Sequence, residues 1–236
     1  MKRPRGGQLQ HKVRIKWSPD FAYAIGLLTA DGCLSKDGRH IQFSSSETTL
    51  VKILKKALSI TNKPTKYARG GETEKKYFFL SFGDKVFYSF LITIGLCPAK
   101  SKVIKSVKVP DKFFSDFLRG LYDGDGTFYA FWDRRWQKSF CFKLSFASAS
   151  KEFILWLKKE LSNRYDTTGY IHKGAGVFNL EYVKGDSKKI VSAMYYKNVL
   201  LFLPRKYRTI LHALKSDTKY GIPALQKQRN SVSLPG

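Results

Sequence analysis

The chain has 236 residues, of which 43% are hydrophobic and 15% aromatic, so it has ample material for a packed core and wholesale disorder is excluded. Its 43 Lys and Arg residues against 18 Asp and Glu residues give a formal charge of +25. Because such an excess repels itself, we expect a polyanionic partner, and nucleic acid is favoured over a membrane surface. No apolar stretch approaches the roughly 18 residues of a membrane-spanning helix.

The N-terminal segment is basic and lacks the apolar region of a secretory signal. We therefore expect an intracellular protein, in the cytoplasm, the nucleoid or an organelle, that is not secreted. The three cysteines, Cys33, Cys97 and Cys141, are widely spaced and form no Cys-x-x-Cys pair, and the four histidines are scattered. This pattern indicates a reducing environment and argues against a disulfide framework and a zinc finger.

The first half of the chain begins with a predicted helix. Ser18 is its expected N-cap, Pro19 occupies the first helical position, and Asp31-Gly32 ends it because glycine suits a left-handed helix exit. The hydrophobic periodicity that follows predicts, in chain order, a hairpin turning at 36–38, a helix over 47–60, a hairpin over 66–82 turning near 69–72, and a helix over 84–96.

The second half has the same predicted order of elements. They are a helix over 111–124, a hairpin over 127–148 turning near 133–136, a helix over 150–163, a hairpin over 168–184, and a helix over 186–202. The tail from Lys215 is polar and is expected to be peripheral.

Three segments of the first half recur in the second half in the same order. The matches are Phe21–Gly32 with Ser115–Gly126, Phe43–Leu58 with Phe146–Leu161, and Pro98–Ile104 with Pro204–Ile210. Three matches in register predict an internal duplication of an α-β-β-α-β-β-α unit and an α+β, pseudo-twofold fold. The expected organisation is a basic N-terminal arm (1–16), an N-terminal half (17–109), a C-terminal half (110–213) and a polar C-terminal tail (214–236).

Small residues lie four apart on each helix that ends in Asp-Gly, namely Gly26 and Ala30, and Gly120 and Gly124. This spacing allows two helix backbones to approach closely, which brings together their C-termini and the acids Asp31 and Asp125. Carboxylates at two negative helix ends favour a divalent cation, and oxygen ligands suit Mg²⁺. A single Asp-Gly pair is also an ordinary helix end. An EF-hand is disfavoured because Phe128 and Arg134 occupy positions that need Gly and Glu.

The segments Ala24–Gly32 and Leu118–Gly126 resemble the nine-residue motif of the LAGLIDADG homing endonucleases, and the resemblance covers about residues 17–213. It implies metal binding by Asp31 with the Ala30 carbonyl, and by Asp125 with the Gly124 carbonyl. It also implies Mg²⁺ as the cofactor, with Mn²⁺ substituting and Ca²⁺ binding without supporting cleavage.

The resemblance further implies a basic residue near each scissile phosphate, at Lys100 and Lys206, which follow the closing helical stretch of each half. Such a cation would stabilise the developing negative charge or lower the pKa of the attacking water. Lys102 and Arg208 are alternatives, and all four are also consistent with ordinary solvated cations.

Strand alternation leaves polar side chains on the sheet faces turned away from the core; Gln42, for example, lies between the inward Ile41 and Phe43. These faces and the basic hairpin tips form an expected saddle along the major groove, although each residue is also typical of a solvated sheet face. Gln and Asn suit adenine, Lys and Arg suit guanine, and Glu181 would accept from cytosine. The candidate DNA contacts are His40, Gln42, Ser44, Arg69, Lys75, Arg134, Arg135, Lys143, Lys173 and Asn179.

The sequence therefore predicts a monomeric, Mg²⁺-dependent endonuclease that cuts both strands of double-stranded DNA at a long asymmetric site. The family resemblance implies 3′ overhangs and intron homing, by an intron-encoded or free-standing enzyme. Two alternatives remain open: a maturase that binds intron RNA, and a regulator that binds DNA without cutting. The presence of both acids weighs against loss of cutting, but a maturase could retain it.

Overall fold

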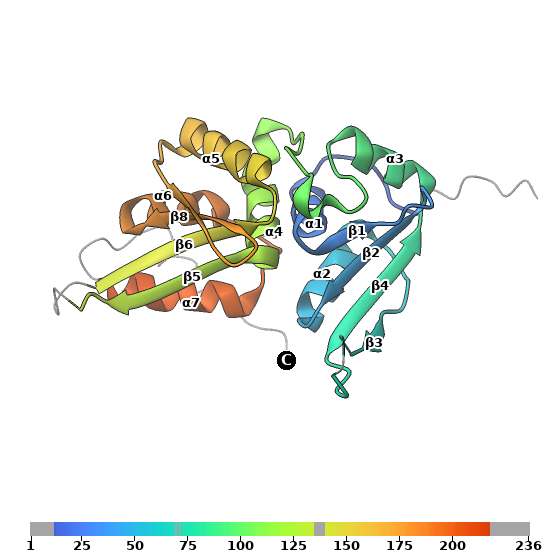
Figure 1. Ribbon diagram of the computed structural model, residues 1–236, viewed down its shortest axis with the longest axis horizontal. Helices are drawn as coiled ribbons and strands as arrows, with labels where there is room; N and C mark the ends of the chain where they lie inside the picture. The colour runs from blue at the N-terminus through green and yellow to red at the C-terminus, as the bar shows by residue number, and fades with distance from the viewer. Residues whose placement is uncertain (1–11, 69, 71, 135–139, 218–236) are drawn as a thin grey trace, which may run out of the picture.

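The computed structural model describes residues 12–68, 70, 72–134 and 140–217 (Figure 1). The first half contains α1 (Pro19–Asp31), β1 (Gly32–Leu34), β2 (His40–Ser45), α2 (Thr48–Leu58), β3 (Thr65–Tyr67), β4 (Tyr77–Gly83), α3 (Lys85–Thr93) and the 3₁₀ helix η1 (Lys100–Lys102). The second contains the 3₁₀ helix η2 (Asp111–Phe113), α4 (Phe114–Asp125), β5 (Gly126–Trp132), β6 (Phe140–Ser148), α5 (Lys151–Tyr165), β7 (Tyr170–Lys173), β8 (Phe178–Val183), α6 (Lys184–Met194) and α7 (Pro204–Ser216).

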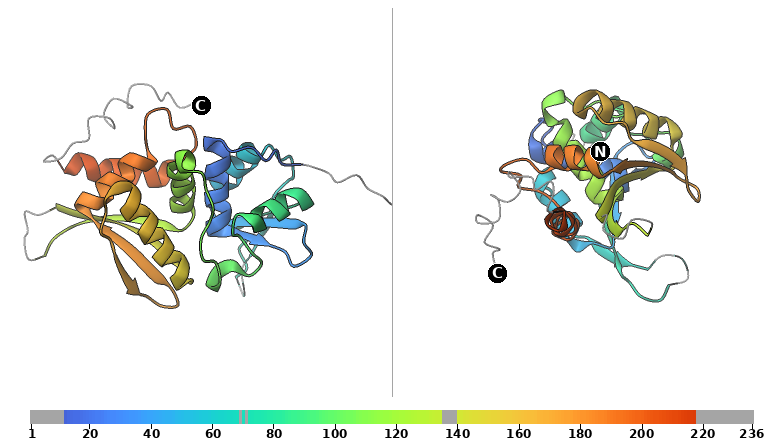
Figure 2. Two further views of the ribbon diagram at one scale, coloured as in Figure 1. Left: turned by 90° about the horizontal axis from the view of Figure 1, so that it is seen from above. Right: turned by 90° about the vertical axis from the view of Figure 1, so that its left-hand side faces the viewer.

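Each half builds one antiparallel four-stranded sheet, with strand orders β1-β2-β4-β3 and β5-β6-β8-β7. The two sheets lie on either side of α1 and α4, which run side by side through the centre (Figures 1 and 2). Helices α2 and α3 pack on the first sheet and α5 and α6 on the second. This architecture confirms the α+β fold with paired central helices that the sequence predicts.

Strand alternation positions the core as expected. In β2, Ile41 and Phe43 are fully buried while Gln42 between them is half-buried. In β6, Phe142, Leu144 and Phe146 are buried in the same way. The buried side chains face the helices, and the opposite face of each sheet is turned away from them.

The central helices touch backbone to backbone because each carries glycine at the contact. A Cβ atom on Gly26 would lie 2.1 Å from the Phe117 carbonyl oxygen of α4. A Cβ atom on Gly120 would lie equally close, 2.1 Å, to the Tyr23 carbonyl oxygen of α1. No larger residue fits at either position without separating the helices, so these glycines hold the two C-terminal ends together.

The exit of α1 differs from the sequence expectation. Gly32 is extended, with φ −79°, rather than left-handed. Its lack of a side chain matters for a different reason: a Cβ atom there would lie 2.4 Å from the Leu28 carbonyl oxygen. Gly126 has the same role in α4, where a Cβ atom would lie 2.2 Å from the Tyr122 ring. Both glycines let the chain turn directly from the helix into a strand.

The C-terminal region also differs. The prediction of one helix over 186–202 is wrong at its C-terminal end, since α6 stops at Met194. Asn198 then adopts a left-handed conformation with φ 68°. A separate helix, α7, begins at Pro204, which suits a first helical position, and packs against β5. Just beyond α7, Asp217 is 4% exposed and forms ion pairs with lysines of α6, so the start of the expected tail is packed on the domain. The rest of that tail, 218–236, lies outside the described residues.

Candidate metal and nucleic-acid site

The acids at the ends of the central helices are brought together by the helix contact. A Cβ atom on Gly124 would lie 2.4 Å from the Ala30 Cβ and 3.2 Å from the Asp31 Oδ2 atom. The Asp31 carboxylate therefore lies against the last turn of α4, beside the residue that precedes Asp125. Removal of water by the surrounding protein raises the pKa of the Asp125 carboxyl, and Lys100 and Lys206 partly offset that rise.

The donor set at this point suits a hard divalent cation. It consists of carboxylate oxygens from two helices, placed where the helix dipoles add further negative charge. Among the described residues, no group of three or more His, Cys, Asp or Glu side chains comes together. The aspartates would thus leave most ligand positions to water and to a substrate phosphate, which is how Mg²⁺ is commonly held. The residues present fit Mg²⁺.

Lys100 reaches the end of α1 from the 3₁₀ helix η1. Its side chain is buried, with 8% exposed, and its ammonium group donates a hydrogen bond to the Ala30 carbonyl oxygen at 2.8 Å. Burial lowers the pKa of Lys100, while Asp125 and Asp31 oppose that change. Its alternative from the sequence, Lys102, is exposed.

Lys206 reaches the end of α4 from the first turn of α7. Its ammonium group donates to the carbonyl oxygens of Tyr122, Gly124 and Gly126 at 2.8, 3.0 and 2.7 Å. Burial lowers its pKa to about 8, even though Asp123, Asp125 and Asp31 act in the opposite direction. Arg208, the alternative in this half, is exposed and donates within its own helix to the Pro204 carbonyl.

The two lysines bond to the backbone carbonyl groups that the family resemblance implies as metal ligands. Ala30 and Gly124 each accept a hydrogen bond from a lysine ammonium group, so each has at most its second lone pair left for a cation. The lysines therefore neutralise the helix ends, and the Asp31 and Asp125 carboxylates are the acidic oxygen donors beside them.

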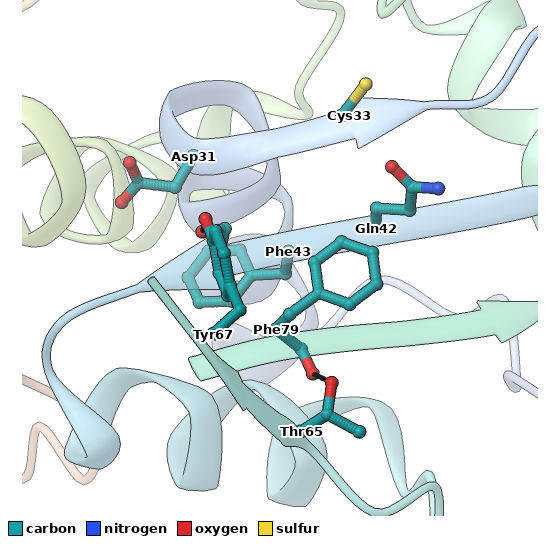
Figure 3. Close-up of a pocket in the computed structure, with 8 residues that line it drawn as sticks. Asp31, Cys33, Gln42, Phe43, Thr65, Tyr67 and Phe79 are labelled. Atoms are coloured by element: carbon teal, nitrogen blue, oxygen red, sulfur yellow. Dashed lines mark hydrogen bonds between the residues drawn. The ribbon is translucent and has the colours of Figure 1, made fainter. Parts of the chain in front are cut away.

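The first sheet carries a pocket of about 370 Å³ that begins at Asp31 and extends over β1, β2, β3 and β4 (Figure 3). Gln42 and Cys33 lie on one side of it, and Tyr67 and Phe79 form an aromatic side. Ser44 also lines the pocket and its hydroxyl lies 2.5 Å from the Tyr67 hydroxyl. Apart from Asp31, the side chains that line this pocket are uncharged.

The second sheet presents a charged network at the corresponding place. Glu181 accepts hydrogen bonds from Tyr129 at 3.0 Å, from Lys143 at 3.0 Å and from Tyr170. Lys143 also donates to the Tyr170 hydroxyl at 2.5 Å. These three bonds leave the Glu181 carboxylate little capacity to accept from a cytosine amino group, while Lys143 keeps one ammonium N–H beyond its two bonds.

The remaining candidate DNA contacts are dispersed. His40 forms a hydrogen bond with Asp37 at the outer end of β2, and Asn179 is half-buried in β8 opposite Ala147. Lys75, Arg134 and Lys173 are exposed near the hairpin ends, whereas Arg69 and Arg135 lie outside the described residues.

Sequence reasoning missed the partners of these groups. Tyr129 lies on β5, in the other hairpin of the sheet, and Tyr170 lies opposite Glu181 on β7, so only the strand register brings these side chains together. Asp123, buried beneath Asp125, was also missed. Its signal was present, since it follows Asp116 and Arg119 at helical spacing on a face that the first half fills with Ala22, Ile25 and Thr29.

Solved structures with the same fold include LAGLIDADG proteins. The homing endonuclease I-WcaI bound to its DNA recognition sequence matches with a TM-score of 0.60 at 14% identity, over 84% of this chain and 88% of that one. I-DmoI in complex with DNA and Ca matches with a TM-score of 0.53 at 16% identity, over 82% and 97%. The N-terminal LAGLIDADG domain of DUF199/WhiA matches with a TM-score of 0.52 at 17% identity, over 89% and 98%.

No protein-family model matches the sequence, and no curated protein matches it. The structural likeness, all at low identity, establishes that the chain has the fold of LAGLIDADG homing endonucleases. Within the described ranges, no helix is both long and apolar enough to cross a bilayer.

Proposed function

We propose that this protein is a site-specific endonuclease that hydrolyses one phosphodiester bond on each strand of double-stranded DNA. The observation that carries the proposal is the meeting of Asp31 and Asp125 at two abutting helix ends, with Lys100 and Lys206 bonded to those same ends. Two acids and two cations at a pseudo-twofold centre match the symmetry of two strands in a duplex.

Asp31 and Asp125 would hold Mg²⁺, which when bound neutralises phosphate charge and lowers the pKa of water. Mn²⁺ should substitute, and Ca²⁺ should bind without supporting cleavage. The likeness to I-DmoI in complex with DNA and Ca supports a divalent cation at this fold. Lys100 and Lys206 would place an ammonium group beside each scissile phosphate and stabilise the charge that develops there.

The basic surface and the two sheets would bind the DNA duplex. The formal charge of +25 supplies sequence-independent affinity through the phosphates. The uncharged side chains that line the pocket of the first sheet and the Lys143–Glu181 network of the second would read different bases, so the target is asymmetric. Because one chain contributes both sheets, we infer that the enzyme acts as a monomer at a long site. A DNA target implies an intracellular location, and a long site is what intron homing requires.

A DNA-binding regulator without nuclease activity is the second candidate. It is favoured by the lysine contacts to Ala30 and Gly124, which reduce the oxygen ligands left for a metal, and by the likeness to the LAGLIDADG domain of WhiA. A maturase acting on intron RNA is the third, since the same basic surface suits folded RNA.

The test is incubation with a randomised duplex library in Mg²⁺ and, separately, in Ca²⁺. We expect double-strand breaks in Mg²⁺ only, and loss of at least about 10³-fold in rate for Asp31→Asn and for Asp125→Asn, with binding retained. Asp20→Asn is the matched control, because Asp20 lies at the opposite end of α1. Tight binding without any Mg²⁺-dependent cleavage would favour the regulator. Wild-type cleavage by Asp31→Asn or Asp125→Asn would contradict the role of that aspartate as a metal ligand.

A further inference from the structure

Asp123 is a buried carboxylate that joins three segments around the proposed site. It lies in α4, two residues before Asp125, and is 1% exposed. Its Oδ2 atom accepts a hydrogen bond from the Tyr23 hydroxyl of α1 at 2.6 Å and from the Leu203 backbone N–H at 2.7 Å. A buried carboxylate is costly unless it is hydrogen-bonded, so these contacts strongly restrain the groups that make them.

The contact with Leu203 sets the start of α7. Leu203 is the N-cap residue of that helix, and its side chain makes no capping hydrogen bond. Pro204 follows as the first helical residue, and Lys206 lies in the same first turn, with its ammonium group on the carbonyls at the end of α4. Asp123 thus holds the backbone from which Lys206 projects to a position beside its own helix end.

The first half places its lysine differently. Thr29, which occupies the position of Asp123 in the duplicated unit, donates to the Ile25 carbonyl within α1 at 2.8 Å. Lys100 instead follows Ala99, whose left-handed conformation (φ 52°) starts the 3₁₀ helix η1. Thr29 bonds within its own helix and not to the backbone that carries Lys100, so a contact like that of Asp123 is found at this position in the second half alone.

We propose that Asp123 is a positioning residue for Lys206 and that it controls cleavage of one DNA strand. This rests on the proposed function. Lys206 lies on the end of α4 and Lys100 on the end of α1, and a pseudo-twofold axis relates these ends. Because a similar axis relates the two strands of a duplex, each lysine faces a different scissile phosphate. Displacing Lys206 should therefore slow cleavage of one strand and leave the cleavage rate of the other strand unchanged.

The experiment is single-turnover cleavage of a selected target duplex that carries a different label on each strand. For Asp123→Ala we expect the cleavage rate of one strand to fall by about 10²-fold relative to the wild type. The cleavage rate of the other strand should stay within about two-fold of the wild-type rate, so that nicked duplex accumulates. The slowed strand should be the one that Lys206→Met slows and not the one that Lys100→Met slows. Asp123→Asn keeps an acceptor for the Leu203 N–H and should restore most of the rate.

Thr29→Val is the matched control at the equivalent position of α1 and should leave both strands unchanged. Equal slowing of both strands by Asp123→Ala, or slowing of the Lys100 strand, would overturn the proposal in favour of a general structural role. Failure of Asp123→Asn to restore the rate, in a variant whose thermal unfolding matches the wild type, would also overturn it.

A second readout separates this inference from the proposed function. Amide hydrogen exchange at Leu203 should accelerate in Asp123→Ala and stay slow in Asp123→Asn, and this requires no cleavage. If the wild-type protein cuts no DNA, the proposed function fails while the exchange result still decides whether Asp123 holds the start of α7. Unchanged protection of Leu203 in Asp123→Ala would overturn the positioning role.

Discussion

The two halves share their order of elements but differ beside the central helices. At equivalent positions of the duplicated unit, α1 carries apolar or neutral residues where α4 carries ionic ones. The pairs are Ala22 and Asp116, Ile25 and Arg119, and Thr29 and Asp123. All six are buried, so the second half holds the Asp116–Arg119 ion pair and the Asp123 carboxylate where the first half has only uncharged side chains.

The ionic residues contact a connection that is longer in the second half, where 195–203 join α6 to α7, than in the first, where 94–99 join α3 to η1. Arg119 donates to the Met194 carbonyl and to the Leu201 carbonyl, both at 2.7 Å, and to Asp116 at 2.7 Å. Met194 ends α6, and Leu201 belongs to the irregular segment that leads to α7. Buried carbonyl groups need donors, and a segment without regular structure must obtain them from side chains. The comparison teaches that a longer connection required a polar core beneath it.

The largest expected effect comes from removing Arg119. Arg119→Ile, which copies the first half, leaves Asp116 as a buried unpaired charge and should lower the free energy of unfolding by about 3–5 kcal/mol. The double variant Asp116→Ala and Arg119→Ile copies the first half at both positions and should be clearly more stable than the single one. Urea denaturation measures both. Additive losses in the double variant would mean that the two side chains do not act as a pair.

A smaller and symmetric effect is expected at the helix contact. Gly26→Ala and Gly120→Ala each place a Cβ atom against backbone of the opposite helix, and each should cost about 1–3 kcal/mol of unfolding free energy. Gly185→Ala is the matched control, because a Cβ atom there meets nothing within 4 Å in α6. Its stability should be unchanged or raised. A marked difference between Gly26→Ala and Gly120→Ala would show that the contact is not shared equally.

The smallest effect concerns base preference. Lys143 retains one ammonium N–H beyond its bonds to Glu181 and Tyr170, which suits guanine, whereas Gln42 beside its pocket suits adenine. Lys143→Met and Gln42→Leu should each relax discrimination at one base pair by about 1–2 kcal/mol, in opposite halves of the target. Selection of bound sequences from a randomised duplex measures this. Loss of preference at the same base pair in both variants would contradict separate reading by the two sheets.

Local patterns were sufficient to predict most of the fold. The cap at Ser18 and the alternation in β2 and β6 act between near neighbours, so the sequence shows them directly. The duplication placed Asp31 and Asp125 at equivalent helix ends. The glycines at 26 and 120 then implied that those ends meet, since only a close helix contact makes such spacing useful.

The contacts that complete the site depend on groups far apart in the chain. Lys206 bonds to α4 only because α6 stops at Met194 and α7 begins at Pro204, a break that hydrophobic periodicity does not reveal. Strand register gives Glu181 its three hydrogen-bond donors, and packing brings the Asp123 carboxylate to the Leu203 N–H. Sequence reports which residues prefer a helix, a strand or the interior. The pairing of buried polar groups follows from packing, because each donor must find whichever acceptor the assembled core places beside it.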